Sequence, residues 1–371
     1  MPDIEISTII ISTIDTSIND AQSWQRLLAN SIVTPEALSA ILPVDPEVVR
    51  RVTQKYPMRI NPYFLSLISE KNSPLWRQCV PDIQELDHDV ALEPDPLWEE
   101  PQSPVANLIH RYPDRVLFMV SSQCAMYCRH CMRKRRVGAH GHISENDLDR
   151  GIAYIRSQPG LKEVILSGGD PLLLADDRIE RLLAQLHQIP HVDMIRIHTR
   201  TPCTLPQRIT DDLVAVFRRF APLYINIQFN HPDEITQAAA TACESLADAG
   251  IPLGSQTVLL KGVNDDPEVM MRLMQKLLKI RVRPYYLHHA DPIEGTRHFR
   301  TSLETGKRIM AHLRGRMSGM GVPHYMIDLP QGGGKVPILP DYIKPDHNKK
   351  DAPGKLMVKN FEGNIFTYPA G

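Results

Sequence analysis

Short apolar runs recur along the chain from about residue 115, and amphipathic segments separate them. The runs are rich in Val, Ile and Tyr and read VLFMVSS (116–122), EVILS, MIRIHT, LYINIQF, SQTVLL, RPYYLHH and HYMIDL. Between them, apolar residues fall at helical spacing in segments 177–189, 206–220, 234–250, 266–280 and 302–317. Strands that alternate with helices in this way predict β/α units and a parallel sheet.

The number of these units limits the fold of residues 108–330. Six or seven units are too few for a complete eight-fold barrel, so we expect a partial, open β/α barrel. Active sites in such sheets lie at the C-terminal ends of the strands. The motifs that follow strands are therefore the candidates for a functional site.

The two flanking regions lack this alternation. In residues 1–107 we expect short helices, one of them opening at Thr34-Pro35-Glu36 with proline in its first turn. The proline-rich segments 74–86 and 92–104 look extended, and we expect them to wrap over the barrel. Residues 331–371 form a C-terminal segment with a strand-like run KLMVKNF and a turn at Glu362-Gly363-Asn364.

Composition excludes several classes of protein. The formal net charge of −1 over 371 residues gives no general basic field for nucleic acid. The apolar stretch at 8–11 has no basic region before it, and no run of about 18 apolar residues occurs, so we expect neither a signal peptide nor a membrane span. With six cysteines in a chain of this size, ligation of a metal or cluster in a reducing cytoplasm is favoured over disulfides.

Three of the six cysteines fall within eight positions, as Cys124, Cys128 and Cys131 in a C-x3-C-x2-C pattern after the first strand. Buried thiols or a zinc site are the alternatives, but structural zinc takes four ligands and no second cysteine pair follows. Three thiolates on a [4Fe–4S] cluster leave one iron open for a ligand. The pattern resembles the radical S-adenosylmethionine superfamily. That resemblance implies that the open iron binds S-adenosylmethionine and that one electron cleaves it to a deoxyadenosyl radical.

A glycine turn, Ser167-Gly168-Gly169-Asp170, follows the strand EVIL. Glycine lets the backbone approach a ligand closely, although many such turns are only tight connections. Beside the cysteines, the turn resembles the superfamily segment that contacts S-adenosylmethionine. Gln256 in SQTVLL is a further candidate contact or an ordinary polar residue of the barrel interior.

The segment DLPQGGGKVPILP places Lys335 after three glycines. It is not a P-loop, because Leu329 stands where the first glycine is required and Val336 where Ser or Thr is required. Two interpretations are left open by the segment alone. Lys335 is either exposed on a flexible loop or forms a Schiff base with pyridoxal phosphate.

Blocks in a fixed order resolve this choice through a resemblance. HRYPDRVLF, CAMYCRHC, SGGDPLL, RTPCTLPQRIT, FNHPDEIT, LLKGVND, KIRVRPYYL, HFRTS and GGGKVP resemble the lysine 2,3-aminomutase family. The resemblance implies a pyridoxal phosphate aldimine at Lys335. His110, Arg111, Tyr112 and Arg115 are then candidates to hold its phosphate or ring, the two arginines being best suited by charge.

The same resemblance indicates how a substrate would be held. Arg133 matches the position that binds the substrate carboxylate, whereas Arg135 and Arg136 read as solvated or paired with acidic groups. Asp291 and Asp328 match the two aspartates that meet the ε-ammonium of lysine, although Asp291-Pro292 also reads as a helix start. Two carboxylates together favour a cationic side chain between them.

The resemblance implies migration of the amino group of lysine from the α- to the β-carbon, with reduced flavodoxin or ferredoxin as electron donor and a homo-oligomer as the assembly. An aminomutase for arginine, or a relative that modifies elongation factor P, stays open. Rivals of other classes are a non-catalytic iron–sulfur protein and a zinc-binding structural protein. Well-known members bind zinc through a cysteine-rich tail. Cys243 matches their helix cysteine, but the tail Tyr368-Pro369-Ala370-Gly371 has none, and Cys79 and Cys203 look structural.

Overall fold

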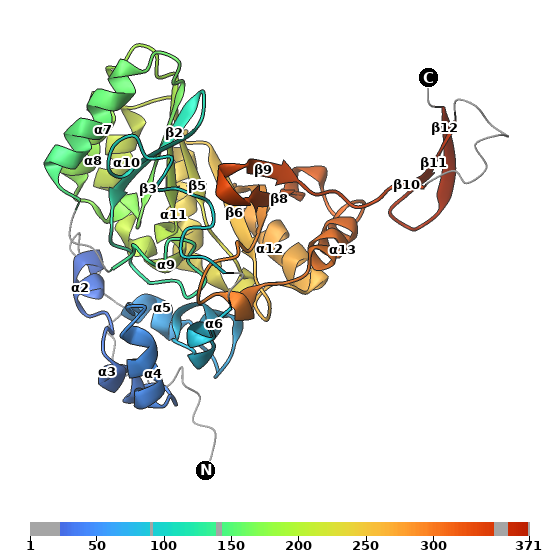
Figure 1. Ribbon diagram of the computed structural model, residues 1–371, viewed down its shortest axis with the longest axis horizontal. Helices are drawn as coiled ribbons and strands as arrows, with labels where there is room; N and C mark the ends of the chain where they lie inside the picture. The colour runs from blue at the N-terminus through green and yellow to red at the C-terminus, as the bar shows by residue number, and fades with distance from the viewer. Residues whose placement is uncertain (1–22, 90–91, 139–142, 345–354, 370–371) are drawn as a thin grey trace.

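The computed structural model describes residues 23–89, 92–138, 143–344 and 355–369, so the apolar stretch at 8–11 lies outside the described residues. At its centre is a nine-stranded sheet in which each strand pairs with the next along the chain (Figure 1). Strands β2 to β8 are parallel, as predicted. They are β2 (Arg115–Ser121), β3 (Glu163–Gly168), β4 (Met194–Thr199), β5 (Leu223–Ile227), β6 (Leu253–Leu259), β7 (Arg283–His289) and β8 (His324–Leu329).

Two antiparallel strands, β1 (Leu108–Tyr112) and β9 (Gly334–Pro337), form the edges of this sheet. Neither was expected from the sequence, because LIHRY carries three polar residues and GKVP follows a run of glycines. The partial β/α barrel is confirmed, and β9 adds a return strand beside β8. That return strand carries Lys335 into the sheet rather than onto a loop.

Helices cover the outer face of the parallel strands (Figure 1). In α12, residues Met270, Leu273, Met274 and Leu277 are buried at the three- and four-residue spacing expected of an amphipathic helix. The helix α7 was not among the predicted ones. The barrel helices are α7 (Glu145–Ser157), α8 (Asp176–His187), α9 (Thr201–Thr204), α10 (Asp211–Arg218), α11 (Gln237–Asp248), α12 (Pro267–Lys279) and α13 (Leu303–Leu313).

Short helices make up the region before the barrel. They are α2 (Ser23–Ala29), α3 (Pro35–Ser39), α4 (Pro46–Thr53), α5 (Pro62–Ser66), α6 (Pro74–Cys79) and the 3-10 turn η1 (Ile83–Leu86). The helix expected at Thr34 is present as α3, with the Thr34 hydroxyl accepting from the amide of Ala37. The extended conformation expected for 74–86 is wrong. Ser73 caps α6, and Pro74 stands at a first-turn position where proline is tolerated.

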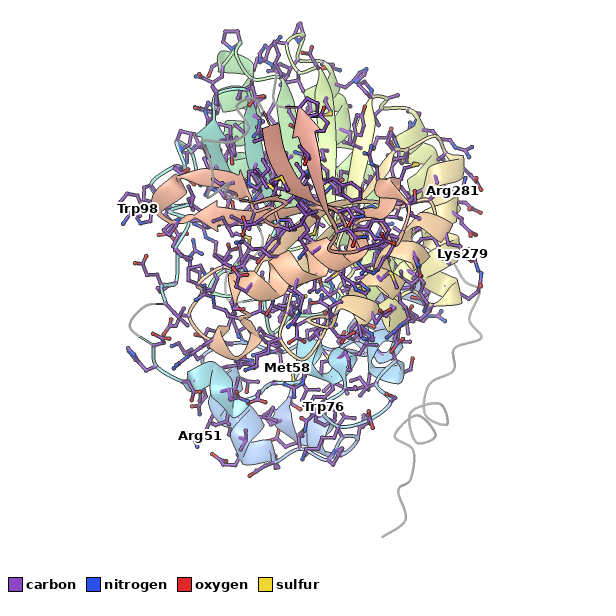
Figure 2. All side chains as sticks on the ribbon, turned by 90° about the vertical axis from the view of Figure 1, so that its right-hand side faces the viewer. Arg51, Met58, Trp76, Trp98, Lys279 and Arg281 are labelled. Carbon is purple, nitrogen blue, oxygen red and sulfur yellow. The ribbon has the colours of Figure 1, made fainter. Side chains whose placement is uncertain are left out.

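One large apolar core joins this region to the barrel. It contains Phe64 of α5 and Phe118 of β2 together with Tyr325 of β8, all fully buried. Figure 2 shows Met58 and Trp76 in the layer of N-terminal helices below the sheet, and both are buried. The N-terminal helices are therefore packed against the barrel and contribute to its core.

The end of the described chain forms a separate small sheet of β10 (Ile343–Lys344), β11 (Lys355–Lys359) and β12 (Ile365–Pro369). It projects away from the barrel in Figure 1. The predicted strand and turn in this tail are confirmed, since the chain reverses between β11 and β12. Within the part of the chain that the structure describes, no helix has the length and apolar character needed to cross a membrane.

Candidate functional site

The cysteine loop, residues 122–138, follows β2 and is held in place by the N-terminal helices. Arg59 donates to the carbonyl of Cys124 at 3.2 Å, and Asn61 donates to the carbonyl of Ala125 at 3.0 Å. In the other direction the amides of Tyr127 and Arg129 donate to carbonyls of the N-terminal region. Backbone bonds to a rigid region fix the loop more firmly than side-chain packing alone.

The three cysteine side chains are free thiols that lie near one another at the end of β2. Burial raises the pKa of Cys131 to about 11 and that of Cys124 well above its usual value, and the neighbouring sulfurs add to both effects. Nη1 of Arg200 donates to Sγ of Cys128 at 2.7 Å. Among the described residues no three His, Cys, Asp or Glu side chains are arranged to hold a single ion. Three thiols beside a buried cation fit a cluster, in which each thiolate binds a different iron.

The basic side chains after the cysteines are neutralised by acidic partners. Arg129 and Lys134 both bind the buried carboxylate of Glu85, at 2.6 and 2.5 Å. Burial disfavours an ionised Glu85, but the two cations outweigh it and hold the pKa of Glu85 below its usual value. Arg135 binds Asp95 at 2.9 Å. This charge therefore stabilises the loop, and little of it is left for an anionic ligand.

Arg133 has one nitrogen that its acidic partner does not use. Its Nε and Nη2 bind Glu99 at 3.1 and 2.7 Å, and the whole side chain is buried. Nη1 is directed at the hydroxyl of Ser167, 3.4 Å away. The remaining donor capacity of the guanidinium is therefore on the side of the glycine turn.

The glycine turn after β3 packs directly against the cysteine loop. Gly168 has φ +137°, and a Cβ at this position would lie 2.2 Å from the carbonyl oxygen of Ser121. The amides of Gly169 and Asp170 donate to carbonyls of Ser121 and Gln123, each at 2.6 Å. These amides are therefore committed to the loop and are not free for a ligand. Glycine is required here because two backbone segments touch.

Asp170 is also used within the fold. Its carboxylate accepts from the hydroxyl of Thr199 at 2.7 Å, from the amide of Arg200 at 2.7 Å and from the amide of Leu172 at 3.0 Å. It thereby joins the ends of β3 and β4 and sets the position of Arg200. A cavity of about 270 Å³ lies beside the turn and is lined by Gly168, Gly169 and Arg133.

Lys335 and Asp328 face each other across the β8–β9 pair, where they are direct register partners. Nζ of Lys335 lies 2.5 Å from Oδ2 of Asp328, and Nη1 of Arg111 lies 3.6 Å from Oδ1. The pKa of Asp328 is lowered: burial opposes its ionisation, but His288 and Lys335 outweigh burial. The side chain of Lys335 is 30% exposed, so its amine is accessible as well as paired.

Asp291 follows β7 and is the second carboxylate at this end of the barrel. No hydrogen bond or ion pair of its side chain is present among the described residues. Burial, and after it the charge of Asp328, raise the pKa of Asp291 to about 7 against the opposing effect of Lys335. The two aspartates are close enough to influence each other, and only Asp328 has a cation bound.

The arginines and tyrosine proposed for a phosphate or ring lie on β1 and β2 beside Lys335. The hydroxyl of Tyr112 accepts from the backbone amide of Lys335 at 3.0 Å, and the guanidinium of Arg115 stacks 3.9 Å above the Tyr112 ring. Arg111 donates to Gln102 and to the carbonyl of Leu97. His110 instead binds the hydroxyl of Tyr154 at 2.7 Å.

Several polar atoms in the barrel interior have no hydrogen-bond partner in the described residues. They include Nε2 of His198 on β4, Nδ2 of Asn226 on β5 and Oδ1 of Asp328. Gln256 lies on the half-buried face of β6. The alternate residues of this strand, such as Thr257, lie on its other, buried face, which is turned toward the helices. Buried polar atoms without partners are uncommon, and their concentration here indicates a place for a polar ligand.

Sequence comparison is consistent with this geometry. The family model of the radical SAM superfamily matches residues 118–274, and the fold and cysteine loop define a protein of this class. A second family model, lysine-2,3-aminomutase, matches residues 310–371. The L-lysine 2,3-aminomutases of Clostridium subterminale and Acetoanaerobium sticklandii are 45% and 46% identical, over 95% and 94% of this chain and 85% and 84% of theirs. The chain belongs to the lysine 2,3-aminomutase family.

The family contains more than one substrate class. A glutamate 2,3-aminomutase of Clostridioides difficile is 41% identical over 96% of this chain and 84% of its own length. Proteins of the family use a [4Fe–4S] cluster, S-adenosylmethionine and pyridoxal phosphate. The choice of substrate therefore has to be argued from the side chains.

Sequence reasoning missed the groups that position the expected site residues. Glu99 forms an ion pair with Arg133. Arg200 donates to Cys128, and His288 lies beside Asp328. Glu99 and Arg133 are 34 positions apart, and no local pattern joins them. The one available signal for Arg200 was its position directly after a barrel strand, where functional groups gather.

Proposed function

We propose that this protein is an isomerase that moves the α-amino group of L-lysine to the β-carbon and forms β-lysine. The observation that carries this proposal is the pair of aspartates at the open end of the barrel. Among the described residues Asp291 forms no ion pair, and burial together with the charge of Asp328 raises its pKa, so a second negative charge is disfavoured at this position. The ammonium of a lysine side chain would relieve that repulsion, whereas the carboxylate of glutamate would increase it.

We assign the pyridoxal phosphate site to Lys335, Arg111, Tyr112 and Arg115. The unpartnered Oδ1 of Asp328 and the nearby Nε2 of His198 are polar atoms that a bound cofactor and substrate would meet. The arginines supply positive charge suited to a phosphate, and Tyr112 fixes the backbone of Lys335. These residues fit the group in charge and in position.

We assign the cluster to Cys124, Cys128 and Cys131, and the S-adenosylmethionine site to the side of Ser167, Gly168, Gly169, Asp170 and Gln256. When bound, the cluster cleaves S-adenosylmethionine to a carbon radical, and pyridoxal phosphate holds the substrate nitrogen during its migration. Gly169 and Asp170 would act by fixing the turn against the cysteine loop. Gln256 is the polar side chain that β6 offers to a ligand.

The remaining roles follow from the free donors and acceptors. Nη1 of Arg133 is available for the substrate carboxylate, because Glu99 occupies Nε and Nη2. Lys335 must lose a proton before its amine can react. Oδ2 of Asp328 accepts from the amine of Lys335, and Nδ1 of His288 lies 3.7 Å from the same oxygen, so these two side chains would orient the amine.

A small reduced carrier such as flavodoxin or ferredoxin would supply the electron, in the cytoplasm, to a homo-oligomer of this chain. The six free thiols support a reducing compartment.

Anaerobic reconstitution with iron, sulfide, pyridoxal phosphate and S-adenosylmethionine tests the proposal. Lysine, arginine, ornithine and glutamate are incubated separately with the enzyme, and the products are separated by chromatography. We expect β-lysine from lysine and no product from glutamate. Conversion of arginine or glutamate with lysine left unchanged would contradict the substrate, and a protein that binds no iron–sulfur cluster would contradict the reaction class.

A further inference from the structure

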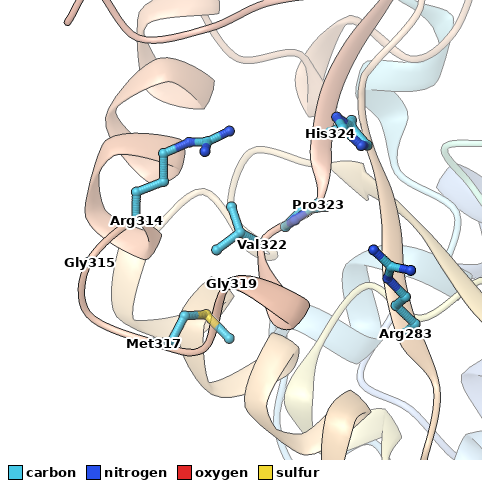
Figure 3. Close-up of a pocket in the computed structure, with 8 residues that line it drawn as sticks. All are labelled: Arg283, Arg314, Gly315, Met317, Gly319, Val322, Pro323 and His324. Atoms are coloured by element: carbon cyan, nitrogen blue, oxygen red, sulfur yellow. The ribbon is translucent and has the colours of Figure 1, made fainter.

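A cavity of about 440 Å³ lies at the end of the barrel opposite the cysteine loop. Arg283 and His324, the first residues of β7 and β8, form one side of it, and the segment after α13 forms the other (Figure 3). His324 precedes Asp328 by four residues, so at about 3.3 Å per residue the cavity is roughly 13 Å from the lysine–aspartate pair. It is separate from the candidate active site. Its lining residues are Arg283, Arg314, Gly315, Met317, Gly319, Val322, Pro323 and His324.

Two arginines without partners line this cavity. Among the described residues, neither Arg283 nor Arg314 forms an ion pair or a side-chain hydrogen bond, and Nε of Arg314 is buried with its donor unused. No Asp or Glu is among the lining residues. The arginines of the cysteine loop, in contrast, are paired with carboxylates. A buried guanidinium donor without an acceptor is costly, so this cavity favours an anion.

Other groups complete the lining. Figure 3 shows the guanidinium of Arg314 extending from the end of α13, with the ring of His324 and the guanidinium of Arg283 on the strand side. Tyr342, which does not line the cavity, lies near Arg314, and its buried hydroxyl has no hydrogen-bond partner among the described residues. Val322, Pro323 and Met317 add apolar surface.

We propose that this cavity binds a small molecule that carries a phosphate group. Its donors come from β7, from β8 and from the segment after α13, and a tetrahedral oxyanion presents oxygens in all of these directions, unlike a planar carboxylate. Guanidinium groups bind phosphate oxygens in pairs. The apolar wall leaves room for an organic part, and the volume is within the range of small-molecule sites. Because the cavity is remote from Lys335, occupancy does not compete with the amino acid substrate.

Equilibrium dialysis of the reconstituted holoenzyme with radiolabelled inorganic phosphate tests this proposal. In the holoenzyme, pyridoxal phosphate would already be bound to the arginines near Lys335. Any radiolabelled phosphate that binds would therefore be bound at another site. The variants are Arg314→Gln and Arg283→Gln, and the matched control is Arg316→Gln, an exposed neighbour that does not line the cavity. Thermal unfolding without phosphate confirms that each variant is folded, and the exposed Arg283 provides a usable variant if Arg314→Gln fails to fold.

We expect one saturable phosphate site whose affinity falls about tenfold or more in either cavity variant, since each removes a charge-assisted contact, and stays unchanged in the control. Lysine turnover without added phosphate should be the same in all of these proteins. Sulfate should displace phosphate, and acetate at equal concentration should not. The proposal is overturned if no saturable phosphate binding occurs below about 10 mM. It is also overturned if the variant that carries both Arg283→Gln and Arg314→Gln binds phosphate as the unchanged protein does, or if acetate competes as well as sulfate.

Discussion

At the scale of single residues, the candidate site depends on two carboxylates in different states. Asp328 is compensated by Lys335 and approached by Arg111, and its pKa is lowered. Asp291 lacks such a partner in the described residues, and its pKa is raised to about 7. This difference is the basis for proposing that Asp291 meets the cationic end of the substrate.

This difference predicts how substrate binding depends on pH. The ionised fraction of Asp291 increases as the pH rises through about 7, and the ionised form attracts an ammonium. We expect the KM for lysine to fall between about pH 6 and pH 8. Asp291→Asn should raise KM about tenfold, because a hydrogen bond to a charged group is lost. Because the carboxyl group is removed, KM should also become independent of pH in this range. Steady-state kinetics measure both, and an equal pH slope in the Asn variant would contradict the assignment.

The covalent role proposed for Lys335 gives a second prediction. Lys335→Ala should still fold, because the residue is on an edge strand, but should lose the visible absorbance of bound pyridoxal phosphate. Lys279→Ala, an exposed lysine at the end of α12, is the control and should retain that absorbance. Spectra after gel filtration separate the two cases. Retention of the absorbance by Lys335→Ala would show that another amine holds the cofactor.

The cysteines were singled out by their spacing, and Lys335 and the two aspartates through the family resemblance; their roles stay predictions. The sequence could not predict their partners. Glu99 reaches Arg133 and Glu85 reaches Arg129 only after the chain has folded, and each of these acids comes from a segment with no motif of its own. Local sequence patterns therefore could not predict that the basic side chains of the cysteine loop form ion pairs.

At the scale of elements, the parallel strands were predictable because each is a continuous apolar run between amphipathic helices. The edge strands were not, since pairing with a neighbour, and not composition, makes β9 a strand. The helix α6 was misread because its prolines suggested extended chain, whereas Pro74 follows the capping residue Ser73. In the sequence, a proline in the first turn of a helix cannot be told from a proline in an extended segment unless the residue that caps the helix is also recognised.

The contact between the β3 turn and the cysteine loop can be tested at Gly168. A methyl group there would meet the carbonyl oxygen of Ser121 at 2.2 Å, and φ is +137°. Gly168→Ala should destabilise the protein by about 1–3 kcal/mol and lower the iron content after reconstitution, because the cysteine loop must shift. Gly160→Ala, with its nearest atom 3.7 Å away, is the matched control. Urea unfolding and iron analysis are the measurements, and equal results for both variants would contradict the role of this contact.

At the scale of the whole molecule, both the N-terminal region and the barrel bind side chains of the cysteine loop. Glu85 of η1 binds Arg129 and Lys134, and Lys134 also donates to the carbonyl of Gly295 after β7. Three parts of the chain that are far apart in sequence thus meet at one buried carboxylate. The N-terminal region is therefore a structural support of the candidate cluster site.

Removal of this carboxylate should affect both stability and cluster loading. Glu85→Ala leaves two buried cations without a counter-charge, which should cost about 3–5 kcal/mol in urea unfolding, and iron content should fall. Because the pKa of Glu85 is lowered in the fold, its stabilising effect is present above its unfolded pKa and is lost as the pH falls through the lowered value. Glu36→Ala, which removes a surface partner of Arg50, should change little. Similar effects of the two variants would argue against a supporting role.

The hairpin between β8 and β9 makes the direction of the Lys335 amine sensitive to the length of the connection. Successive side chains of a strand point to opposite faces, so a single residue added between Pro330 and Gly333 that makes β9 slip by one position against β8 would turn Lys335 away from Asp328. Every group needed for chemistry would still be encoded, yet the amine would face the wrong way. A two-residue insertion would restore the facing, so activity across such a series should alternate with the parity of the insertion.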